Sequence, residues 1–313
     1  MRILFMGTPE FALISLEKLI EAGEEVVGVI TQPDRPRGRG RRVTASPVKA
    51  FAQEKAIPVY QPERLKDGEV LEKLAGFAPD LIVVVAYGKI LPREVLELPP
   101  LGCINVHASL LPRYRGAAPI HWAIIRGEGV TGVTTMYIDE GMDTGDIILQ
   151  EEVPILPEDN AGTLHDKLAH AGARLLLDTV ARIKAGTAPR IPQPEEGVSY
   201  APPLERTDEI LDWNRPARQL WFQVRGLNPW PGAMTYWQGE ILKVWEVSPL
   251  KGDGDAAPGE IIAVDKQEGI LVGTGKGLLR LEVVQPAGKR RMTASDFARG
   301  YGVKEGLFFG GGA

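Results

Sequence analysis

Residues 81–86 read LIVVVA, an uninterrupted apolar run that decides the fold class. A strand of this kind is covered on both faces, as in a parallel sheet between two layers of helices. Alternating strands and helices predict an α/β fold, a doubly wound Rossmann-like parallel sheet. The other expected strands lie at 2–6, 24–31, 57–60 and 103–106, and helices are expected between them at about 9–22, 46–55 and 67–76.

The second half of the chain changes character. Residues 131–138 and 146–155 predict two strands around an acidic loop, and residues 162–185 predict a long amphipathic helix. A proline-rich stretch follows, then a helical pattern at 213–227 and five short strands separated by glycines. Such strands predict a small barrel or sandwich, and we expect a β-barrel of the oligonucleotide-binding type. We therefore expect a catalytic domain at 1–185, a linker at 186–207, a barrel domain at 208–313 and a loosely ordered GLFFGGGA tail.

Composition excludes several classes of protein. The 313 residues are too many for one typical core, and the formal net charge of -5 argues against a uniformly basic surface. Cys103 is the single cysteine, so no internal disulfide forms, and with four histidines a structural zinc site is disfavoured. No apolar run approaches the roughly 20 residues of a membrane span, and the first residues lack the pattern of a signal peptide. We expect a cytoplasmic monomer without a metal.

The stretch at 105–112, NVHASLLP, carries the candidate chemistry. Asn105 and His107 stand two residues apart at the end of an expected strand, so their side chains project to the same face. Ligands of doubly wound sheets bind outside the carboxyl ends of the strands. An amide donor and a titratable ring at that edge are suited to holding a carbonyl oxygen while it becomes an oxyanion.

The turn after the first strand argues against a dehydrogenase. It reads Gly7-Thr8-Pro9 in place of G-x-G-x-x-G, and Pro9 has no amide to offer a pyrophosphate. Ser109 follows the histidine closely but lacks the strand-turn-helix context of a serine nucleophile. We interpret it as a loop hydroxyl that bonds the backbone or a ligand.

An acidic loop at 139–146, DEGMDTGD, is the expected partner of the histidine. One carboxylate there would orient His107 and favour its imidazolium form. Spacing alone leaves the choice open among Asp139, Glu140, Asp143 and Asp146, and acidic turns are also common solvated structures.

The combined pattern resembles the 10-formyltetrahydrofolate-dependent formyltransferases. It consists of MGTPEFA at 6–12, VVAYGKILP at 84–92, the stretch at 105–112, Arg115-Gly116 and Pro119, and the acidic loop. The similarity spans almost the whole chain. It implies that Asn105, His107 and Asp143 are catalytic.

The resemblance also implies a folate site. The implied reaction needs no metal ion. The formyl donor would be 10-formyltetrahydrofolate, with its pterin ring beneath the backbone of the stretch near residues 84–91. The implied folate contacts are Val85, Tyr87, Gly88, Ile90, Leu91, Ser109, Leu110, Leu111, Pro112 and Asp139. Plain loop anchoring is the alternative for Leu110 and Leu111, and both roles are compatible in a mostly apolar pocket.

A basic loop points to a larger substrate. Residues 32–42 read QPDRPRGRGRR, a local anomaly in an acidic chain, although most charge runs are solvated loops. Arginine side chains suit phosphates and base edges. By resemblance, family members that formylate methionine bound to initiator tRNA carry a basic insertion here. The expected tRNA contacts are Arg35, Arg37, Arg39, Arg41 and Arg42. A weaker second patch consists of Lys289, Arg290 and Arg291 with Lys276 and Arg280, for which a solvated face of the barrel is the alternative.

The implied reaction forms N-formylmethionyl-tRNA for translation initiation. Family members that act on a sugar nucleotide or glycinamide ribonucleotide share the catalytic residues, so only the basic loop and the barrel discriminate against them. A non-catalytic RNA-binding protein is the alternative from another class. That alternative leaves Asn105, His107 and the acidic loop unexplained.

Overall fold

The computed structural model describes residues 1–37, 42–250 and 256–310, except for the side chains at 36, 37, 42 and 43. Contacts divide the chain into two compact units. The first contains Met1–Pro119, Val130–Pro154 and His165–Ala201, and the second contains Ile120–Gly129, Ile155–Leu164 and Pro202–Ala313. The expected linker at 186–207 is thus shared between the units, and the domain limits at 185 and 208 stay a prediction.

A seven-stranded mixed sheet forms the centre of the first unit, in the order β5-β2-β1-β6-β7-β8-β9. The first five strands of this order are parallel, whereas β8 is antiparallel to β7 and β9 is antiparallel to β8. The strands are β1 (Arg2–Gly7), β2 (Glu25–Ile30), β5 (Val59–Tyr60), β6 (Leu81–Val85), β7 (Cys103–His107), β8 (Val130–Tyr137) and β9 (Ile147–Pro154).

The α/β Rossmann-like class is confirmed, but the expectation of a wholly parallel sheet is wrong at the β8–β9 edge. His107 pairs with Thr134, and Ile104 pairs with Tyr137. The connection at 108–129 therefore starts β8 at the carboxyl end of β7, and the strand runs back antiparallel. A parallel strand would have required a crossover to the opposite edge of the sheet.

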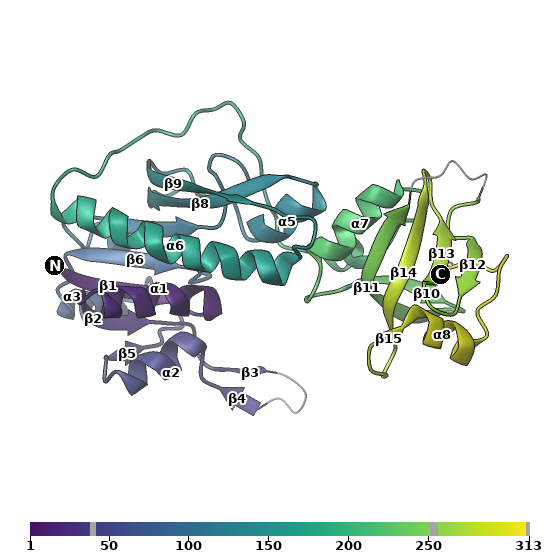
Figure 1. Ribbon diagram of the computed structural model, residues 1–313. Coiled ribbons are helices and arrows are strands. Elements are labelled where there is room, and N and C mark those ends of the chain that lie inside the picture. Colours follow the sequence, from purple (N-terminus) through teal and green to yellow (C-terminus); the bar gives the residue numbers. More distant parts are fainter. Residues whose placement is uncertain (38–41, 251–255, 311–313) are drawn as a thin grey trace. The chain divides into compact units, whose positions relative to one another are not determined.

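Helices cover both faces of this sheet. α1 and α6 lie side by side on one face (Figure 1), where the rings of Phe11 and His165 are 5.4 Å apart. α3 and α4 supply Val70, Leu74 and Val95 to the core on the other face. Continuous burial of β6 follows from this double cover. The helices are α1 (Glu10–Glu21), α2 (Pro47–Glu54), α3 (Gly68–Gly76), α4 (Arg93–Leu96) and α6 (Ala161–Lys184).

Packing of α6 fixes the orientation of β7. A Cβ on Gly172 of α6 would lie 2.8 Å from Val106, so the helix approaches the strand closely because this position is glycine. Val106 thus faces α6, and alternation turns Asn105 and His107 to the opposite face. Cys103 on that face belongs to a core cluster against which Ile138, the residue before the acidic loop, also packs.

Two segments expected to be loops carry defined structure. The basic loop contains a hairpin of β3 (Arg35–Arg37) and β4 (Arg42–Thr44). The part of the expected linker before residue 202 follows the first unit, passing the β9 side of the sheet (Figure 1), where Ile191 pairs with Ile147. Backbone hydrogen bonds also join Arg115 to Ser199 and Ala201.

An antiparallel sheet and two helices form most of the second unit. The sheet order is β10-β11-β14-β13-β12, with β15 beside β14. In this order the described β10 and β12 are not paired with each other, so a closed barrel is not seen. The elements are η1 (Arg206–Glu209), α7 (Ala217–Gly226), β10 (Ala233–Trp237), β11 (Glu240–Leu250), β12 (Ile261–Asp265), β13 (Gly269–Gly273), β14 (Leu278–Pro286), β15 (Met292–Thr293) and α8 (Ala294–Tyr301), with α5 (Pro119–Ile125) mostly in this unit.

The end of the described chain contacts both outer strands of this sheet. Ile261 of β12 donates its N–H to the carbonyl of Leu307 at 2.8 Å, and Gly310 donates to the carbonyl of Tyr236 in β10 at 3.0 Å. Phe309 is buried, 5.4 Å from the ring of Trp237 and 6.1 Å from that of Trp213. The expectation of a loosely ordered tail is therefore wrong for residues 306–310, because an apolar anchor holds them.

Substitution of Phe309 by alanine should lower the free energy of unfolding by about 3–5 kcal/mol, because it removes a buried ring. Phe308→Ala is the matched control, since Phe308 is 53% exposed, and its effect should stay within about 0.5 kcal/mol. Urea unfolding followed by tryptophan fluorescence measures both, because all six tryptophans lie in the second unit. Equal losses for the two variants would contradict the anchor.

Candidate active site

The end of β7 presents Asn105 and His107 on one face, as their spacing predicted. Asn105 lies beside Val84 of β6 and Met136 of β8 in the sheet, and its side chain is half-buried. The Asn105 amide makes no hydrogen bond to another described residue. It is therefore available as a donor at the carboxyl edge of the parallel strands.

His107 is buried and held by both ring nitrogens. Nε2 lies 3.0 Å from the carbonyl oxygen of Tyr114. Because a carbonyl only accepts, this contact puts a proton on Nε2. Nδ1 lies 3.7 Å from Oδ2 of Asp143, which is an ion-pair distance once the ring is protonated. Nδ1 is thus the nitrogen that can gain or lose a proton next to a carboxylate.

The backbone around this ring is unusual at two positions. Tyr114 and Asp143 adopt positive φ angles of 61° and 53°. Such conformations are uncommon outside glycine and asparagine, and they persist where surrounding contacts hold them. Tyr114 is held by the hydroxyl of Ser199, which accepts from its N–H at 2.9 Å. The Asp143 carboxylate accepts from the N–H of Gly116 at 2.8 Å.

The structure brings one of the four acidic candidates to the histidine. Asp139 accepts from the N–H of Gly141 and the hydroxyl of Thr144, so its hydrogen bonds stay within the acidic loop. Glu140 lies 4.0 Å from Arg93, and Asp146 lies 3.8 Å from Arg190. Asp143 alone among the four, all of which are described, lies beside His107.

Gln193 is the main participant that the sequence did not suggest. Its Nε2 donates to the carbonyl oxygens of Asp143 and Gly145, both at 2.8 Å. Its Oε1 accepts from Nε and Nη2 of the buried Arg115, at 3.1 and 2.6 Å. Gln193 therefore ties the acidic loop to the segment after β7. Proline content made this region look like a linker, and no local pattern marked the residue.

The segment after His107 is anchored to β8 and β9. The Thr134 hydroxyl donates to the Ser109 carbonyl at 2.6 Å and accepts from the N–H of Leu111 at 3.1 Å. Gln150 donates to the Leu111 carbonyl at 2.9 Å. Ser109 is fully buried and donates to the carbonyl of Arg113. These contacts favour the loop-hydroxyl interpretation of Ser109.

The apolar side chains of this segment pack into the first unit. Leu111 is buried in a small cluster with Met136 and Ile147. Leu110 lies against Gly132, where a Cβ would come within 2.5 Å of it. Pro112 is half-buried at the end of the segment. Leu110 and Leu111 therefore anchor the loop.

The stretch after β6 divides into buried and exposed parts. Val85, Tyr87 and Leu91 are buried, Gly88 turns with a φ of 83°, and Ile90 is 82% exposed. Burial raises the pKa of Tyr87 to about 12, so the phenol stays protonated. Its hydroxyl has no hydrogen-bond partner within the described structure. Of these predicted folate residues, Ile90 alone offers an exposed side chain.

The basic candidates lie in both units. Arg35 is exposed at the start of the β3–β4 hairpin. Arg39 and Arg41 lie outside the described residues, as do the side chains of Arg37 and Arg42. Lys289 and Arg290 are exposed after β14, next to Arg291, whose guanidinium lies 3.6 Å from the centre of the Trp245 ring.

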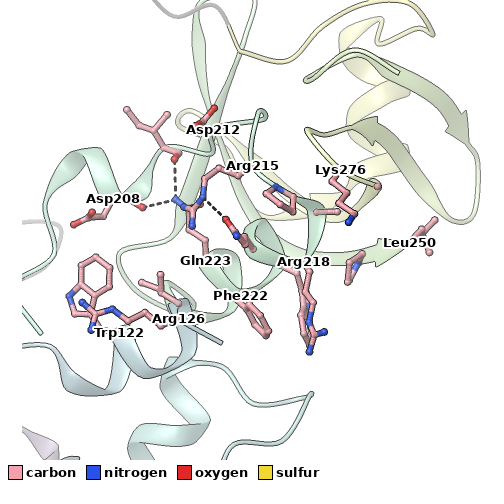
Figure 2. Close-up of a pocket in the computed structure, with 18 of the residues that line it drawn as sticks. Trp122, Arg126, Asp208, Asp212, Arg215, Arg218, Phe222, Gln223, Leu250 and Lys276 are labelled. Atoms are coloured by element: carbon pink, nitrogen blue, oxygen red, sulfur yellow. Dashed lines mark hydrogen bonds between the residues drawn. The ribbon is translucent and has the colours of Figure 1, made fainter. Parts of the chain in front are cut away.

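A groove in the second unit brings Lys276 of the expected second patch together with three arginines that the sequence had not singled out. Figure 2 shows Arg126, Arg215, Arg218 and Lys276 around it, together with aromatic rings. Its volume is about 1390 Å³. Arg126 lies 5.3 Å from the ring centre of Trp122, on an aromatic surface of the kind that stacks with bases. Asp208 and Asp212 offset part of the positive charge.

The geometry at β7 combines an amide donor, an imidazole with one titratable nitrogen and a carboxylate. These are the groups needed to stabilise a developing oxyanion and to relay a proton, as in acyl transfer. Among the described residues no group of three or more His, Cys, Asp or Glu side chains is placed to hold a metal ion. No helix in the described ranges is long and apolar enough to cross a membrane.

Comparisons with known proteins agree on one family. The formyl transferase family matches residues 1–180, and the formyl transferase C-terminal domain matches residues 203–302. A protein of Pelotomaculum thermopropionicum called "Methionyl-tRNA formyltransferase" is 53% identical over 99% of both chains. A protein of the same name from Symbiobacterium thermophilum is 56% identical, over 99% of this chain and 95% of its own. The chain therefore belongs to the formyl transferase family.

Solved structures share the fold at low sequence identity. HypX from Aquifex aeolicus has a TM-score of 0.66 at 19% identity, over 97% of this chain and 48% of its own. An N-formyltransferase from Helicobacter canadensis has a TM-score of 0.63 at 19% identity, over 92% of this chain and 99% of its own. At these identities the likeness concerns the fold.

Replacing Gln193 by methionine should reduce the rate of formyl transfer by about tenfold or more, because misplacing a reacting group by about 1 Å can cost about 100-fold. The change removes both hydrogen bonds from the Gln193 amide to the acidic loop while keeping the size of the side chain. Gln53→Met, on the exposed side of α2 in the same unit, should leave the rate unchanged. A normal rate in the Gln193 variant would show that the loop is positioned without it.

Proposed function

We propose that the protein transfers the formyl group of 10-formyltetrahydrofolate to the α-amino group of methionyl-initiator tRNA. The product, N-formylmethionyl-tRNA, starts translation, and we accordingly propose a cytoplasmic enzyme. Identity above 50% along the full length of proteins called methionyl-tRNA formyltransferases carries this proposal. The basic residues in both units support an RNA substrate over a small amine.

A folate-derived donor fits the residues at the β6–β7 edge. 10-Formyltetrahydrofolate would supply an activated formyl group as the second substrate. The residues proposed to hold it follow β6 and β7. They are Val85, Tyr87, Gly88, Ile90, Leu91, Ser109, Leu110, Leu111, Pro112 and Asp139. The exposed side chain of Ile90 is an apolar group open to a ligand. HypX, which shares the fold, has been solved with tetrahydrofolic acid.

Asn105 and His107 would stabilise the transition state. The amine attacks the formyl carbon, and negative charge develops on the formyl oxygen. The unpaired Asn105 amide donates a neutral hydrogen bond, and a protonated Nδ1 of His107 donates a charge-assisted one. Since Nε2 is already bonded to the Tyr114 carbonyl, Nδ1 is the nitrogen left for this role.

Asp143 would hold the imidazolium and help to move the proton. Its Oδ2 lies 3.7 Å from Nδ1, at an ion-pair distance from a protonated ring. A new bond joins the amine nitrogen to the formyl carbon, the bond from that carbon to N10 breaks, and the proton lost by the amine balances the one gained at N10. α-Amino groups have pKa values of about 8, so a useful fraction is neutral without strong activation.

The second unit would bind the tRNA. We propose that its sheet, with the C-terminal segment across its outer strands, acts as an oligonucleotide-binding barrel. Lys289, Arg290 and Lys276 belong to the expected patch, and the groove in Figure 2 adds three arginines around Lys276. Mixed cationic and aromatic linings suit single strands and RNA ends.

The catalytic assignment is tested by removing each donor. Asn105→Ala and His107→Ala should each lower kcat by about 100- to 1000-fold, the usual cost of one oxyanion donor. The dissociation constant for methionyl-tRNA should stay within a factor of about two, since neither side chain is proposed to bind RNA. Single-turnover formylation and filter binding give these values. Turnover near the wild-type rate would remove the residue from the mechanism.

The role of the basic loop is tested by salt dependence. A variant with Arg35, Arg37 and Arg42 changed to glutamine should bind tRNA more weakly and with a flatter dependence on salt, by about 0.7–0.9 per lost phosphate contact. A control with Arg93, Arg174 and Arg182 changed to glutamine loses the same charge elsewhere. Identical slopes for the two variants would argue against the loop as an RNA contact.

Substrate choice separates the proposal from its alternatives. Incubation with the formyl donor should give formyl transfer to methionyl-initiator tRNA, and no transfer to a sugar-nucleotide amine or to glycinamide ribonucleotide. Transfer to the small amines would favour the sugar and purine branches of the family. Tight RNA binding without transfer would indicate a non-catalytic protein.

A further inference from the structure

A second cavity in the first unit lies outside the catalytic cluster. It has a volume of about 350 Å³, near the lower end of the range of about 300–1,000 Å³ for small-molecule sites. The loops after β1, β2 and β6 and the end of β4 form its walls. This is the carboxyl edge of the parallel strands, where ligands of doubly wound sheets bind. The residues that line it are Thr8, Gln32, Pro33, Asp34, Arg35, Thr44, Ser46, Gly88 and Lys89.

The lining is polar. Thr8, Thr44 and Ser46 supply hydroxyls, while Gln32 and Asp34 supply an amide and a carboxylate. A pterin ring or a methionine side chain would find few apolar partners here. Sugar hydroxyls and a phosphate match these groups, because each can be hydrogen-bonded or paired with charge.

The walls are held in place before any ligand binds. The Gln32 side chain donates to the Tyr87 carbonyl at 3.1 Å, and its N–H donates to the Thr8 hydroxyl at 3.3 Å. Gln61 donates to the carbonyl of Gln32 at 2.8 Å and to the Asp34 carboxylate at 2.9 Å. A site prepared in this way loses little freedom when a ligand enters.

Asp34 has the position and the charge of a ribose acceptor. In doubly wound nucleotide-binding sheets, an acidic residue after the second strand binds a ribose hydroxyl, and Asp34 follows β2. Hydrogen bonds from Lys49 and Gln61 hold the pKa of the Asp34 carboxyl below its ordinary value, so it is ionised at neutral pH. A carboxylate has about four acceptor positions, and these two donors leave some of them open.

Two cations, Arg35 and Lys89, line the cavity. Burial lowers the pKa of Lys89, and the nearby charge of Arg35 lowers it further. The Lys89 ammonium is fixed by the carbonyls of Pro62 and Glu63, at 2.9 and 2.6 Å. Because both side chains carry positive charge, a phosphate in the cavity would be attracted to them.

The cavity lies within reach of the catalytic cluster. Gly88 lines it and follows β6, and β6 pairs with β7 so that Val84 lies beside Asn105. Parallel strands are about 4.8 Å apart. In an aminoacyl ester, only a carbonyl carbon and a Cα separate the ribose oxygen from the α-amino nitrogen. A ribose in this cavity would therefore lie at the loop of the strand next to the one that carries Asn105 and His107, and its ester-linked amine would extend towards them.

We propose that this cavity binds the ribose and 5′-phosphate of the terminal nucleoside of the acceptor RNA. Asp34 accepts from the free ribose hydroxyl, while Arg35 and Lys89 pair with the phosphate. This inference rests on the proposed function, because it names the place of the nucleoside that carries the methionine. A free mononucleotide has the same chemistry, so the test uses intact tRNA.

The ribose contact is tested with methionyl-tRNA that ends in adenosine or in 2′-deoxyadenosine, with methionine on the 3′ oxygen. Wild-type enzyme should prefer the ribose form by about tenfold or more in kcat/KM, since a hydrogen bond to a charged acceptor is lost in the deoxy form. In Asp34→Asn that ratio should fall towards one. Asp166→Asn, an exposed acid of α6, should keep the wild-type ratio.

The phosphate contact is tested with a neutral methylphosphonate as the last linkage of the tRNA. The loss in kcat/KM caused by this linkage should be about tenfold in the wild type and smaller in Lys89→Gln. The exposed Lys55→Gln control should show the full loss.

Each result bears on one proposal. The cavity assignment is overturned if Asp34→Asn keeps the wild-type preference for ribose over deoxyribose and Lys89→Gln keeps the wild-type preference for phosphate over methylphosphonate. It is also overturned if the wild-type enzyme prefers neither the ribose nor the phosphate in kcat/KM. Thr44→Val, which removes a lining hydroxyl without breaking the Asp34 bonds, repeats the ribose test if Asp34→Asn fails to fold. Absence of formylation of unmodified methionyl-tRNA by the wild type would overturn the proposed function itself.

Discussion

The arrangement of the candidate active site depends on how one imidazole ring is held. A carbonyl group cannot donate, so the 3.0 Å contact from His107 to Tyr114 fixes the proton on Nε2. That single constraint leaves Nδ1 as the nitrogen that exchanges a proton, and it points this atom towards Asp143. Both partners have positive φ angles, which the rest of the fold must maintain. Two hydrogen bonds help to maintain them: Ser199 accepts from the N–H of Tyr114, and Gln193 donates to the carbonyl of Asp143.

Close packing behind the strand makes this arrangement rigid. Gly172 lets α6 approach Val106, and the strand between the helix and the acidic loop has little freedom to rotate. The acidic loop begins beside Cys103, where Ile138 donates to its carbonyl at 2.8 Å, and then folds back along β7 to reach His107. In this buried setting, charge-assisted hydrogen bonds are stronger than they would be in water. The proposed oxyanion donors and the polar cavity near Asp34 share one edge of the sheet, as the proposed meeting of two substrates requires.

Much of the fold followed from local patterns. Apolar runs and helical periodicity located the main strands and helices within a few residues, because burial on one or both faces leaves a mark in the sequence. Helix α8 was missed although Thr293 caps it, accepting from the N–H of Asp296, and Gly302 ends it with a φ of 66°. No sequence pattern predicted the antiparallel direction of β8, since the order of apolar and polar residues along a strand is the same in parallel and antiparallel pairing. The anchored end of the chain was misjudged because its glycines concealed the role of Phe309.

The sequence by itself determined the order of the elements and the shared face of Asn105 and His107, since alternation along a strand is a local property. Only the tertiary structure decided which acidic residue meets the histidine. That choice depends on contacts between distant segments, such as Gln193 with Asp143, which are 50 residues apart. Local spacing cannot encode them, because a glycine-containing loop has many conformations until other segments select one.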